Sequence, residues 1–238
     1  MKTILYTIAI AAAATLSFTS CNVKCKKGSG TLKTESRKVT DFSRIQVEGG
    51  FKVILKQDSS LNVDLSIDDN LLEFVETEVS GGTLKISNAR NICGSDDAQI
   101  VIGVKNLEEL KGSGAVKFSS AGRLNVKDIA IELAGAGSTD LDLSAANVRT
   151  EGSGSTDIKL KGQAASNTIS LKGSGKVEAL DFVVGKYNIE TTGAGEYKVN
   201  ALKSLVVKTT GSSTIEYRGN PTDVKNQETG SSTLKKID

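Results

Sequence analysis

The chain has 238 residues, with 30 Lys and Arg against 28 Asp and Glu, 24 glycines, three cysteines and no histidine or tryptophan. Without histidine it can form neither a Ser-His-Asp triad nor an imidazole metal site. Three cysteines are too few for a four-thiolate zinc or iron–sulfur centre, and a net charge of +2 provides no basic field for nucleic acid. The composition therefore indicates no metal, no cofactor and no nucleic-acid partner.

The N-terminal end is typical of an export signal. Residues 1–3 carry one lysine, and residues 4–18 are uncharged and rich in Ala, Ile and Leu. Fifteen residues at about 1.5 Å each are too short to span a bilayer core of about 30 Å, so the segment is interpreted as a signal peptide and not as an anchor helix.

A lipid-attachment motif follows directly. Residues 16–21 read Leu-Ser-Phe-Thr-Ser-Cys, which resembles the lipobox of bacterial lipoproteins, although Phe18 stands where leucine is usual. The resemblance implies a signal peptide at residues 1–20, lipid attachment at Cys21 and a protein held on a membrane of the cell envelope. The alternative is an ordinary secretory signal that leaves Cys21 free.

The segment after Cys21 is polar. Residues 22–38 contain five lysines and one arginine, and we expect residues 21–38 to form a lipidated, flexible tether. Residues 22–24 lack the acidic side chains that some bacteria use to export lipoproteins to the surface, which favours the periplasmic face of the outer membrane. In that oxidising compartment Cys25 and Cys93 form either a disulfide or two unpaired thiols, and the sequence leaves both open.

Short apolar runs of period two dominate from Asp41 onward. The alternation is rich in Val and Ile and predicts half-buried strands around Ile45, Phe51 and Val63. Residues 71–76 are compatible with one or two helical turns, and no long amphipathic helix is expected elsewhere.

A Gly-Ser/Ala-Gly triplet recurs along the body of the chain. Its five full copies contain the glycine pairs Gly112 and Gly114, Gly135 and Gly137, Gly152 and Gly154, Gly173 and Gly175, and Gly193 and Gly195. Degenerate copies follow at residues 211–213 and 230–232, and the intervals between first glycines are 23, 17, 21, 20, 18 and 19 residues. A period near twenty predicts a solenoid whose crowded corners need glycines that can take positive φ.

Apolar residues keep register with the triplet. Four residues before each first glycine, from the second full copy onward, stand Ile131, Val148, Ile169, Ile189 and Val207. Such columns predict an all-β parallel β-helix with one copy per rung of about 20 residues. A chain of antiparallel hairpins is the rival geometry, since a strand, Gly-Ser-Gly and a second strand also make a hairpin.

Three segments together with the triplets resemble a known family. Residues 42–53 read Phe-Ser-Arg-Ile-Gln-Val-Glu-Gly-Gly-Phe-Lys-Val, residues 82–86 read Gly-Thr-Leu-Lys-Ile, and residues 217–221 read Tyr-Arg-Gly-Asn-Pro. In this order they resemble the bacterial auto-transporter adhesin "head GIN" domain family (DUF2807), which has no established catalytic residues. The resemblance implies a right-handed, single-stranded β-helix over residues 39–222, with residues 223–238 as a C-terminal rung or cap.

Few residues suggest catalysis. Asp140 and Asp157 follow similar Gly-Ser-Thr motifs with an offset of 17 residues and could stack to share a cation, but exposed turns, where Asp is common, are the favoured interpretation. The repeated serines have no histidine to activate them and are interpreted as structural.

The sequence therefore supports two hypotheses about function. The first is a non-catalytic, lipid-anchored envelope protein that offers a polar surface to a glycan or protein, as an adhesin would. The alternative is a polysaccharide-degrading β-helix enzyme, which a cleft gathering two carboxylates and a Lys or Arg would favour.

Overall fold

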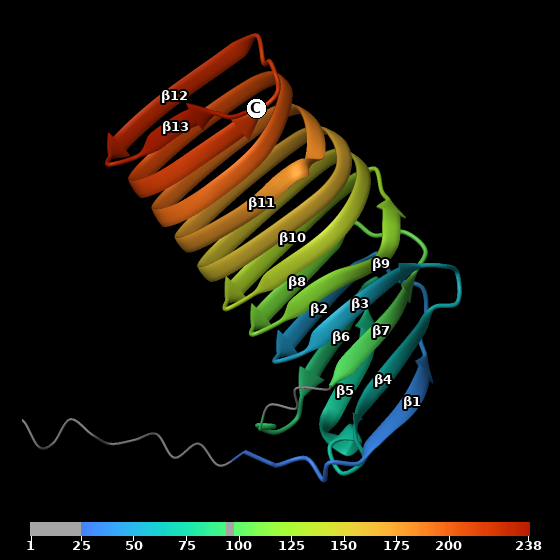
Figure 1. Cartoon of the computed structure of the whole chain (residues 1–238). Helices are drawn as coiled ribbons and strands as arrows, with labels where there is room; N and C mark the ends of the chain where they lie inside the picture. The colour runs from blue at the N-terminus through green and yellow to red at the C-terminus, as the bar shows by residue number, and fades with distance from the viewer. Residues whose placement is uncertain (1–24, 94–97) are drawn as a thin grey trace, which may run out of the picture.

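The computed structural model describes residues 25–93 and 98–238, and within these ranges the fold is all-β (Figure 1). One short 3-10 helix, η2 (Leu72–Phe74), lies among the strands, where the sequence allowed a helical turn. In chain order the strands are β1 (Leu32–Lys38), β2 (Arg44–Gly49), β3 (Lys52–Gln57), β4 (Asn62–Asp68), β5 (Val75–Ser80), β6 (Thr83–Asn88), β7 (Gln99–Val104), β8 (Glu109–Gly114), β9 (Lys117–Asn125), β10 (Asp128–Gly135), β11 (Ser138–Arg218), β12 (Asp223–Gly230) and β13 (Thr233–Lys236).

The strands form one mixed sheet, which corrects the expectation of parallel pairing from residue 39 onward. Near the N-terminus, β1 pairs with β4, β4 with β7 and β5 with β6, all antiparallel. The β5–β6 hairpin has a physical cause in Gly81 and Gly82. Both have positive φ (57° and 75°), as a tight two-residue hairpin turn requires.

From residue 109 onward the described strand pairs are parallel. On one face β8 pairs with β10, β10 with β11, and β11 with β12. On the next face β9 pairs with β11, and β11 with β13. Gly135 lies beside Gly114 and Gly154 beside Gly135, so one turn of the chain takes 21 and then 19 residues. Figure 1 shows residues 109–236, here called the coil, winding with each turn beside the last, and residues 223–236 form its final turn.

One glycine at a corner of each turn stacks on the glycine of the turn before. These residues, here called the glycine ladder, have φ between +97° and +126°: Gly49, Gly114, Gly135, Gly154, Gly173, Gly193, Gly211 and Gly230. A Cβ on Gly154 would lie 2.4 Å from the carbonyl oxygen of Gly135, and one on Gly193 only 2.2 Å from that of Gly173. The ladder therefore requires glycine for its backbone angle and also for the close approach of the next carbonyl.

The ladder corrects the alignment of the triplets. Gly114 and Gly154 are the last residues of their triplets, whereas Gly135, Gly173 and Gly193 are the first. Counted along the ladder from Gly114, the intervals become 21, 19, 19, 20, 18 and 19 residues, which is more regular than the triplet spacing. The repeat was therefore found in the sequence, but its register was wrong by two residues in the copies at 112–114 and 152–154.

The other triplet glycines serve packing and do not take positive φ. They are Gly112, Gly137, Gly152, Gly175 and Gly195. A Cβ on Gly152 would lie 2.7 Å from the Leu171 side chain, and one on Gly175 2.9 Å from the Tyr197 hydroxyl oxygen. The apolar column expected from the triplets is also shifted. Val148 pairs with Ile129 and not with Ile131, and Ile131 pairs with the buried Thr150.

Aliphatic side chains fill the interior of the coil and of the N-terminal strands as one continuous core. Tyr187, Tyr197, Phe118 and Phe182 are its largest fully buried side chains. Tyr197 donates a hydrogen bond to Thr191 Oγ1 at 2.6 Å, and burial raises the pKa of its phenol. Most of the stability of the fold comes from this burial of apolar surface.

The expected tether is packed against the first strands. Cys25 and Cys93 form a disulfide with a Cα–Cα distance of 5.0 Å, and the Lys26 amide donates to the Asn91 carbonyl at 2.8 Å. The Ser29 hydroxyl donates to Asp69 at 2.5 Å, and residues 32–38 form β1. Backbone pairing thus orders residues 25–38, while Cys21 and the expected signal peptide lie outside the described residues.

The ladder yields a matched pair of substitutions. Gly154→Ala adds a backbone clash to the strain of positive φ, whereas Gly122→Ala, with φ +102° and open space around the new Cβ, adds only the strain. We expect Gly122→Ala to lower the free energy of unfolding by about 1–2 kcal/mol, and Gly154→Ala to cost about 1–3 kcal/mol more. Urea unfolding measures both, and equal losses would contradict the role of the stacked carbonyl.

The disulfide closes a segment with a sequence separation of 68 residues. Replacing both cysteines (Cys25→Ser with Cys93→Ser) should lower the free energy of unfolding by about 2–5 kcal/mol, because the unfolded chain regains the entropy of the open loop. Limited trypsin digestion should also cut after Lys26 or Lys27 sooner than in the oxidised protein. A variant as stable and as protected as the parent would show that the bond holds nothing in place.

Candidate functional site

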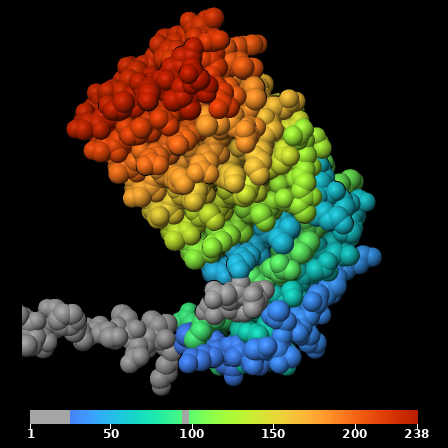
Figure 2. All heavy atoms as spheres, in the orientation of Figure 1, coloured from blue at the N-terminus to red at the C-terminus, as the bar shows by residue number. Residues whose placement is uncertain are grey.

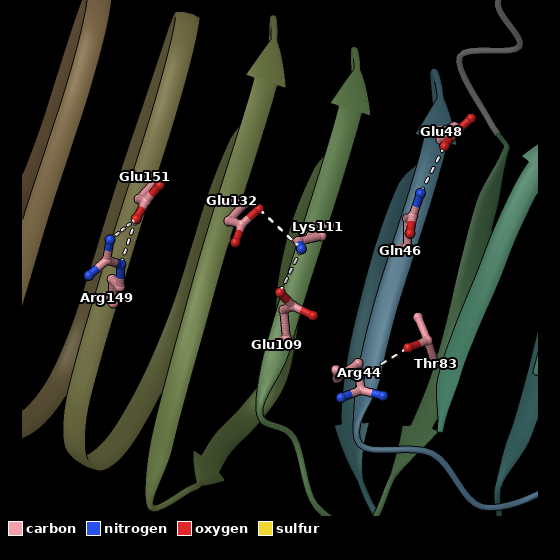
Figure 3. A network of polar contacts seen from close by, with 9 residues as sticks. All are labelled: Arg44, Gln46, Glu48, Thr83, Glu109, Lys111, Glu132, Arg149 and Glu151. Atoms are coloured by element: carbon pink, nitrogen blue, oxygen red, sulfur yellow. Dashed lines mark hydrogen bonds and ion pairs between the residues drawn. The ribbon is translucent and has the colours of Figure 1, made fainter. Parts of the chain in front are cut away.

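A groove of about 500 Å³ lies on the face of the coil that precedes the glycine ladder. It crosses β2, β8, β10 and the next two turns of β11, so its long direction follows the axis of the coil. Figure 3 shows the polar side chains that β2, β8, β10 and β11 present on this face. Because the strands are held in register, the groove is built from columns of outward-facing residues, one from each strand.

Small side chains make the floor of the groove. Ser113 lies beside Ala134, and Ala134 beside Ser153, each directly before a ladder glycine. At the two ends of this column stand the longer Glu48, beside Ser113, and Lys172, directly before Gly173. Four strand spacings of about 4.8 Å separate these ends, which gives a floor column about 19 Å long.

A second column of longer side chains makes one wall. Gln46, Lys111, Glu132 and Glu151 stand side by side on neighbouring strands. The Lys111 Nζ lies 2.8 Å from Glu109 and 3.3 Å from Glu132, and Gln46 donates to Glu48 at 2.9 Å (Figure 3). The wall is therefore a row of hydrogen-bond donors and acceptors, paired in separate local groups.

Opposite charges neutralise one another in this wall. The hydrogen bonds from Lys111 to Glu109 and then to Glu132 hold the pKa of its ammonium above the usual value. Arg149 forms an ion pair with Glu151. Because all these groups are partly exposed, their pairs contribute little to stability, but they hold the side chains in place and leave only a weak net field.

The groove suits a polar, extended ligand. Its lining contains no aromatic side chain among the described residues, and the hydroxyls of Ser113 and Ser153 have no protein partner in this part of the chain. Ligand hydroxyls could therefore exchange hydrogen bonds with the floor and wall without bringing in charge.

The groove also meets the geometric condition set for the enzyme alternative. Glu132 and Glu151 lie on neighbouring strands with Lys111 close by, and the three side chains are between 41% and 43% exposed. Each is already tied into an ion pair, and no group of three or more metal-binding side chains is found in the described ranges. The arrangement thus offers carboxylates, but they are exposed and paired.

A second, more open hollow of about 690 Å³ lies on the face that follows the ladder, around Asp157, Lys176 and Glu196. A column of alternating charge runs along this face: Asp140, Lys159, Glu178, Lys198 and Glu216. The Nζ of Lys159 lies 3.9 Å from Asp140, that of Lys198 lies 3.6 Å from Glu216, and Lys176 from the adjacent column holds the pKa of Glu178 below its usual value. Opposite charges therefore alternate along this face and leave it without a strong field of either sign.

The suggested stacking of Asp140 on Asp157 does not occur. The register places Asp140 beside Ser119, and the Asp157 amide donates to the Gly137 carbonyl, so the two carboxylates lie in different columns. Asp140 instead lies 3.9 Å from Lys159 and 3.8 Å from Lys161. The 17-residue offset was misleading because Asp140 lies five residues after the ladder glycine Gly135, whereas Asp157 lies three residues after the ladder glycine Gly154.

The repeated serines separate onto two faces. Ser113 and Ser153 line the groove before the ladder, whereas Ser174 and Ser212 follow it and line the second hollow. Sequence reasoning treated them as equivalent and so missed the groove. The signal that would have found it is the even spacing of the ladder glycines, which divides each copy into a residue before and a residue after the corner.

A comparison with protein families identifies this chain's relatives. A family model described as "Putative auto-transporter adhesin, head GIN domain" (DUF2807) matches residues 41–221. No curated protein matches the chain significantly. In the described ranges, no helix is long and apolar enough to cross a membrane.

Solved structures share the fold. A "putative adhesin" from Bacteroides fragilis has a TM-score of 0.84 at 24% identity, covering 89% of this chain and all of its own. A "putative lipid binding protein" from Parabacteroides distasonis has a TM-score of 0.73 at 23% identity, covering 90% of this chain and all of its own. A "putative adhesin" from Parabacteroides merdae has a TM-score of 0.67 at 20% identity, covering 90% of this chain and 99% of its own.

The wall network has a measurable chemical consequence. Because Glu109 and Glu132 raise the pKa of Lys111, its amine should react slowly with an activated ester at pH 9. Changing both acids (Glu109→Gln with Glu132→Gln) should speed acylation of Lys111 several-fold, with the distant Lys225 unchanged as a control. Mass spectrometry of labelled peptides measures both rates, and an unchanged rate at Lys111 would contradict the network.

Proposed function

We propose, from the premise that the chain belongs to the auto-transporter adhesin head GIN domain family, that it is a non-catalytic, lipid-anchored protein of the cell envelope. Its function is to bind an extended, hydroxyl-rich chain, such as a glycan, in the groove across β2, β8, β10 and β11. The family name and the sequence of the N-terminal segment support the envelope location.

The observation that carries the binding proposal is the pairing of a small floor with a long polar wall. Ser113, Ala134 and Ser153 leave room for a ligand backbone, while Lys111 and Glu132 beside them offer both donors and acceptors. A sugar unit in an extended chain is close in length to one strand spacing, so successive units would meet successive strands. The paired charges favour a neutral ligand over a strongly charged one.

The anchoring proposal rests on the motif that ends at Cys21. A diacylglyceryl group on its sulfur and a further acyl chain on its amine would hold the protein stably on a membrane. The Lys24 side chain near this cysteine and the absence of acidic neighbours support the periplasmic face of the outer membrane. Glycans or proteins of the envelope are then the partners within reach.

The fold proposal is that the coil is a right-handed, single-stranded parallel β-helix. The parallel offsets of 19 to 21 residues and the stacked ladder glycines support it. Connections between parallel strands of one sheet are right-handed in nearly all proteins, because strand twist favours that hand. This geometry gives the groove a straight floor, since every turn places its corner glycine on the last.

The polysaccharide-degrading enzyme remains the second candidate because Glu132, Glu151 and Lys111 share the groove. Its test is direct: the mature protein is incubated with soluble polysaccharides, and new reducing or unsaturated ends are measured. Turnover that is lost in Glu132→Gln would replace the non-catalytic proposal.

A matched pair of substitutions tests the groove. Ala134 and Ala136 are both exposed and lie on either side of Gly135, but only Ala134 lines the groove. Ala134→Trp should fill the floor and weaken binding to immobilised envelope polysaccharides at least tenfold, or about 1.4 kcal/mol, while Ala136→Trp leaves it unchanged. Biolayer interferometry measures both. Equal effects of the two changes, or none, would contradict the groove as the binding site.

A further inference from the structure

The residues after the proposed lipid site are fixed to one end of the molecule. The disulfide holds Cys25 to Cys93, the Lys26 amide donates to the Asn91 carbonyl at 2.8 Å, and the Cys93 amide donates to the Lys26 carbonyl at 2.9 Å. Each of these contacts lies within the first residues that the structure describes. The chain therefore has no free length after Cys25.

Further contacts continue this attachment across the same end. The Asn70 side chain donates to the Lys27 carbonyl at 3.0 Å, and Asn70 lies two residues before the start of η2. The Ser29 hydroxyl donates to Asp69 at 2.5 Å. Figures 1 and 2 show the N-terminal segment that leads into β1 at the end of the molecule opposite β12 and β13. The point where the chain enters the fold is thus an end and not a flank.

The segment from Cys21 to Cys25, here called the leash, is short. Cys21 and Cys25 are separated by four residue steps, which can span at most about 14 Å at about 3.6 Å each. In contrast, nine strand spacings lie between β5 and β12 on the groove face, counting four turns of β11, and about 4.8 Å each gives about 43 Å. The end of the coil at β12 therefore lies farther from the lipid than the leash can reach, unless the axis of the coil lies parallel to the membrane.

The flank that follows the ladder does not favour a side-on orientation of the coil on a membrane. The column Asp140, Lys159, Glu178, Lys198 and Glu216 alternates in sign along the coil and has three acids against two lysines, so it does not attract anionic lipid. Beside the leash, by contrast, the exposed Lys26 and Lys27 follow Cys25 directly. The exposed Asp69 and Glu73 lie on the same end, so its charges are balanced and the orientation depends on the short segment between Cys21 and Cys25.

We propose that the N-terminal end of the fold, formed by residues 25–31, Asp69, Asn70 and η2, faces the membrane surface, and that the coil stands away from it. The proposal rests on the proposed lipid attachment at Cys21. The groove then lies on a flank with its floor along the membrane normal, nearer the bilayer than the last turns are. A chain bound there would run outward from the membrane.

Energy transfer to the bilayer tests this orientation. Full-length protein is processed in cells, purified with its lipid and placed in vesicles of phosphatidylcholine and phosphatidylglycerol that carry an acceptor-labelled lipid. A donor dye is attached to a single new cysteine, either Glu73→Cys in η2 or Gln227→Cys in β12, both at exposed positions whose side chains have no partner among the described residues. We expect transfer from position 73 to exceed that from position 227 several-fold.

A longer leash is the matched variant. Twelve Gly and Ser residues inserted between Val23 and Lys24 leave the disulfide and the fold untouched but raise the mean leash length to about 22 Å. Transfer from position 73 should then fall several-fold, and the difference between the two positions should shrink. Equal transfer from both positions in the parent protein, or a profile that the insertion leaves unchanged, would overturn the orientation.

The two proposals fail separately. Intact mass and vesicle flotation show whether Cys21 carries lipid. A protein without the diacylglyceryl mass that does not float overturns the lipid anchor and the orientation together. A lipidated, floating protein with equal transfer from both labels overturns the orientation alone and leaves the anchor in place.

Discussion

The close contact between stacked corner glycines is the constraint on which this structure depends. Each ladder glycine takes a positive φ, and from Gly114 onward the carbonyl of the glycine before it occupies the space that a Cβ would need. Only glycine meets both demands, so the chain can turn sharply at the same place in every turn. That shared corner keeps the strands of both neighbouring faces in register and lets side chains form straight columns, apolar inside and polar outside.

The candidate site follows from the same corner. A residue directly before a ladder glycine faces one side of the coil, and a residue directly after it faces the next, as Ala134 and Ala136 illustrate. Small residues before the corner at Ser113, Ala134 and Ser153 open the groove, and the strand register places the paired charges of Lys111 and Glu132 beside it. On the following face, by contrast, longer side chains of alternating charge stand in one column from Asp140 to Glu216.

Much of this architecture could be predicted from the sequence, because the spacing of the repeated triplets gives the length of one turn of the coil. The all-β class, the rung length and one of the two states offered for Cys25 and Cys93 agree with the structure. The register could not be predicted from the triplets, since Gly-x-Gly reads alike from either glycine while only one of the two takes positive φ. The antiparallel start was missed although Gly81-Gly82 signals a hairpin, and ordering of residues 25–38 depends on contacts distant in sequence.

We propose that the glycine ladder separates a face that binds a ligand from a face that does not. Backbone amide chemical-shift mapping of the mature protein, titrated with oligosaccharides released from bacterial envelopes, tests it most directly. We expect shift changes to concentrate at Ser113, Ala134 and Ser153, and to leave Ser155 and Ser174, across the ladder, unmoved. Changes that centre on Ser155 and Ser174, or that spread evenly over both faces, would contradict the claim.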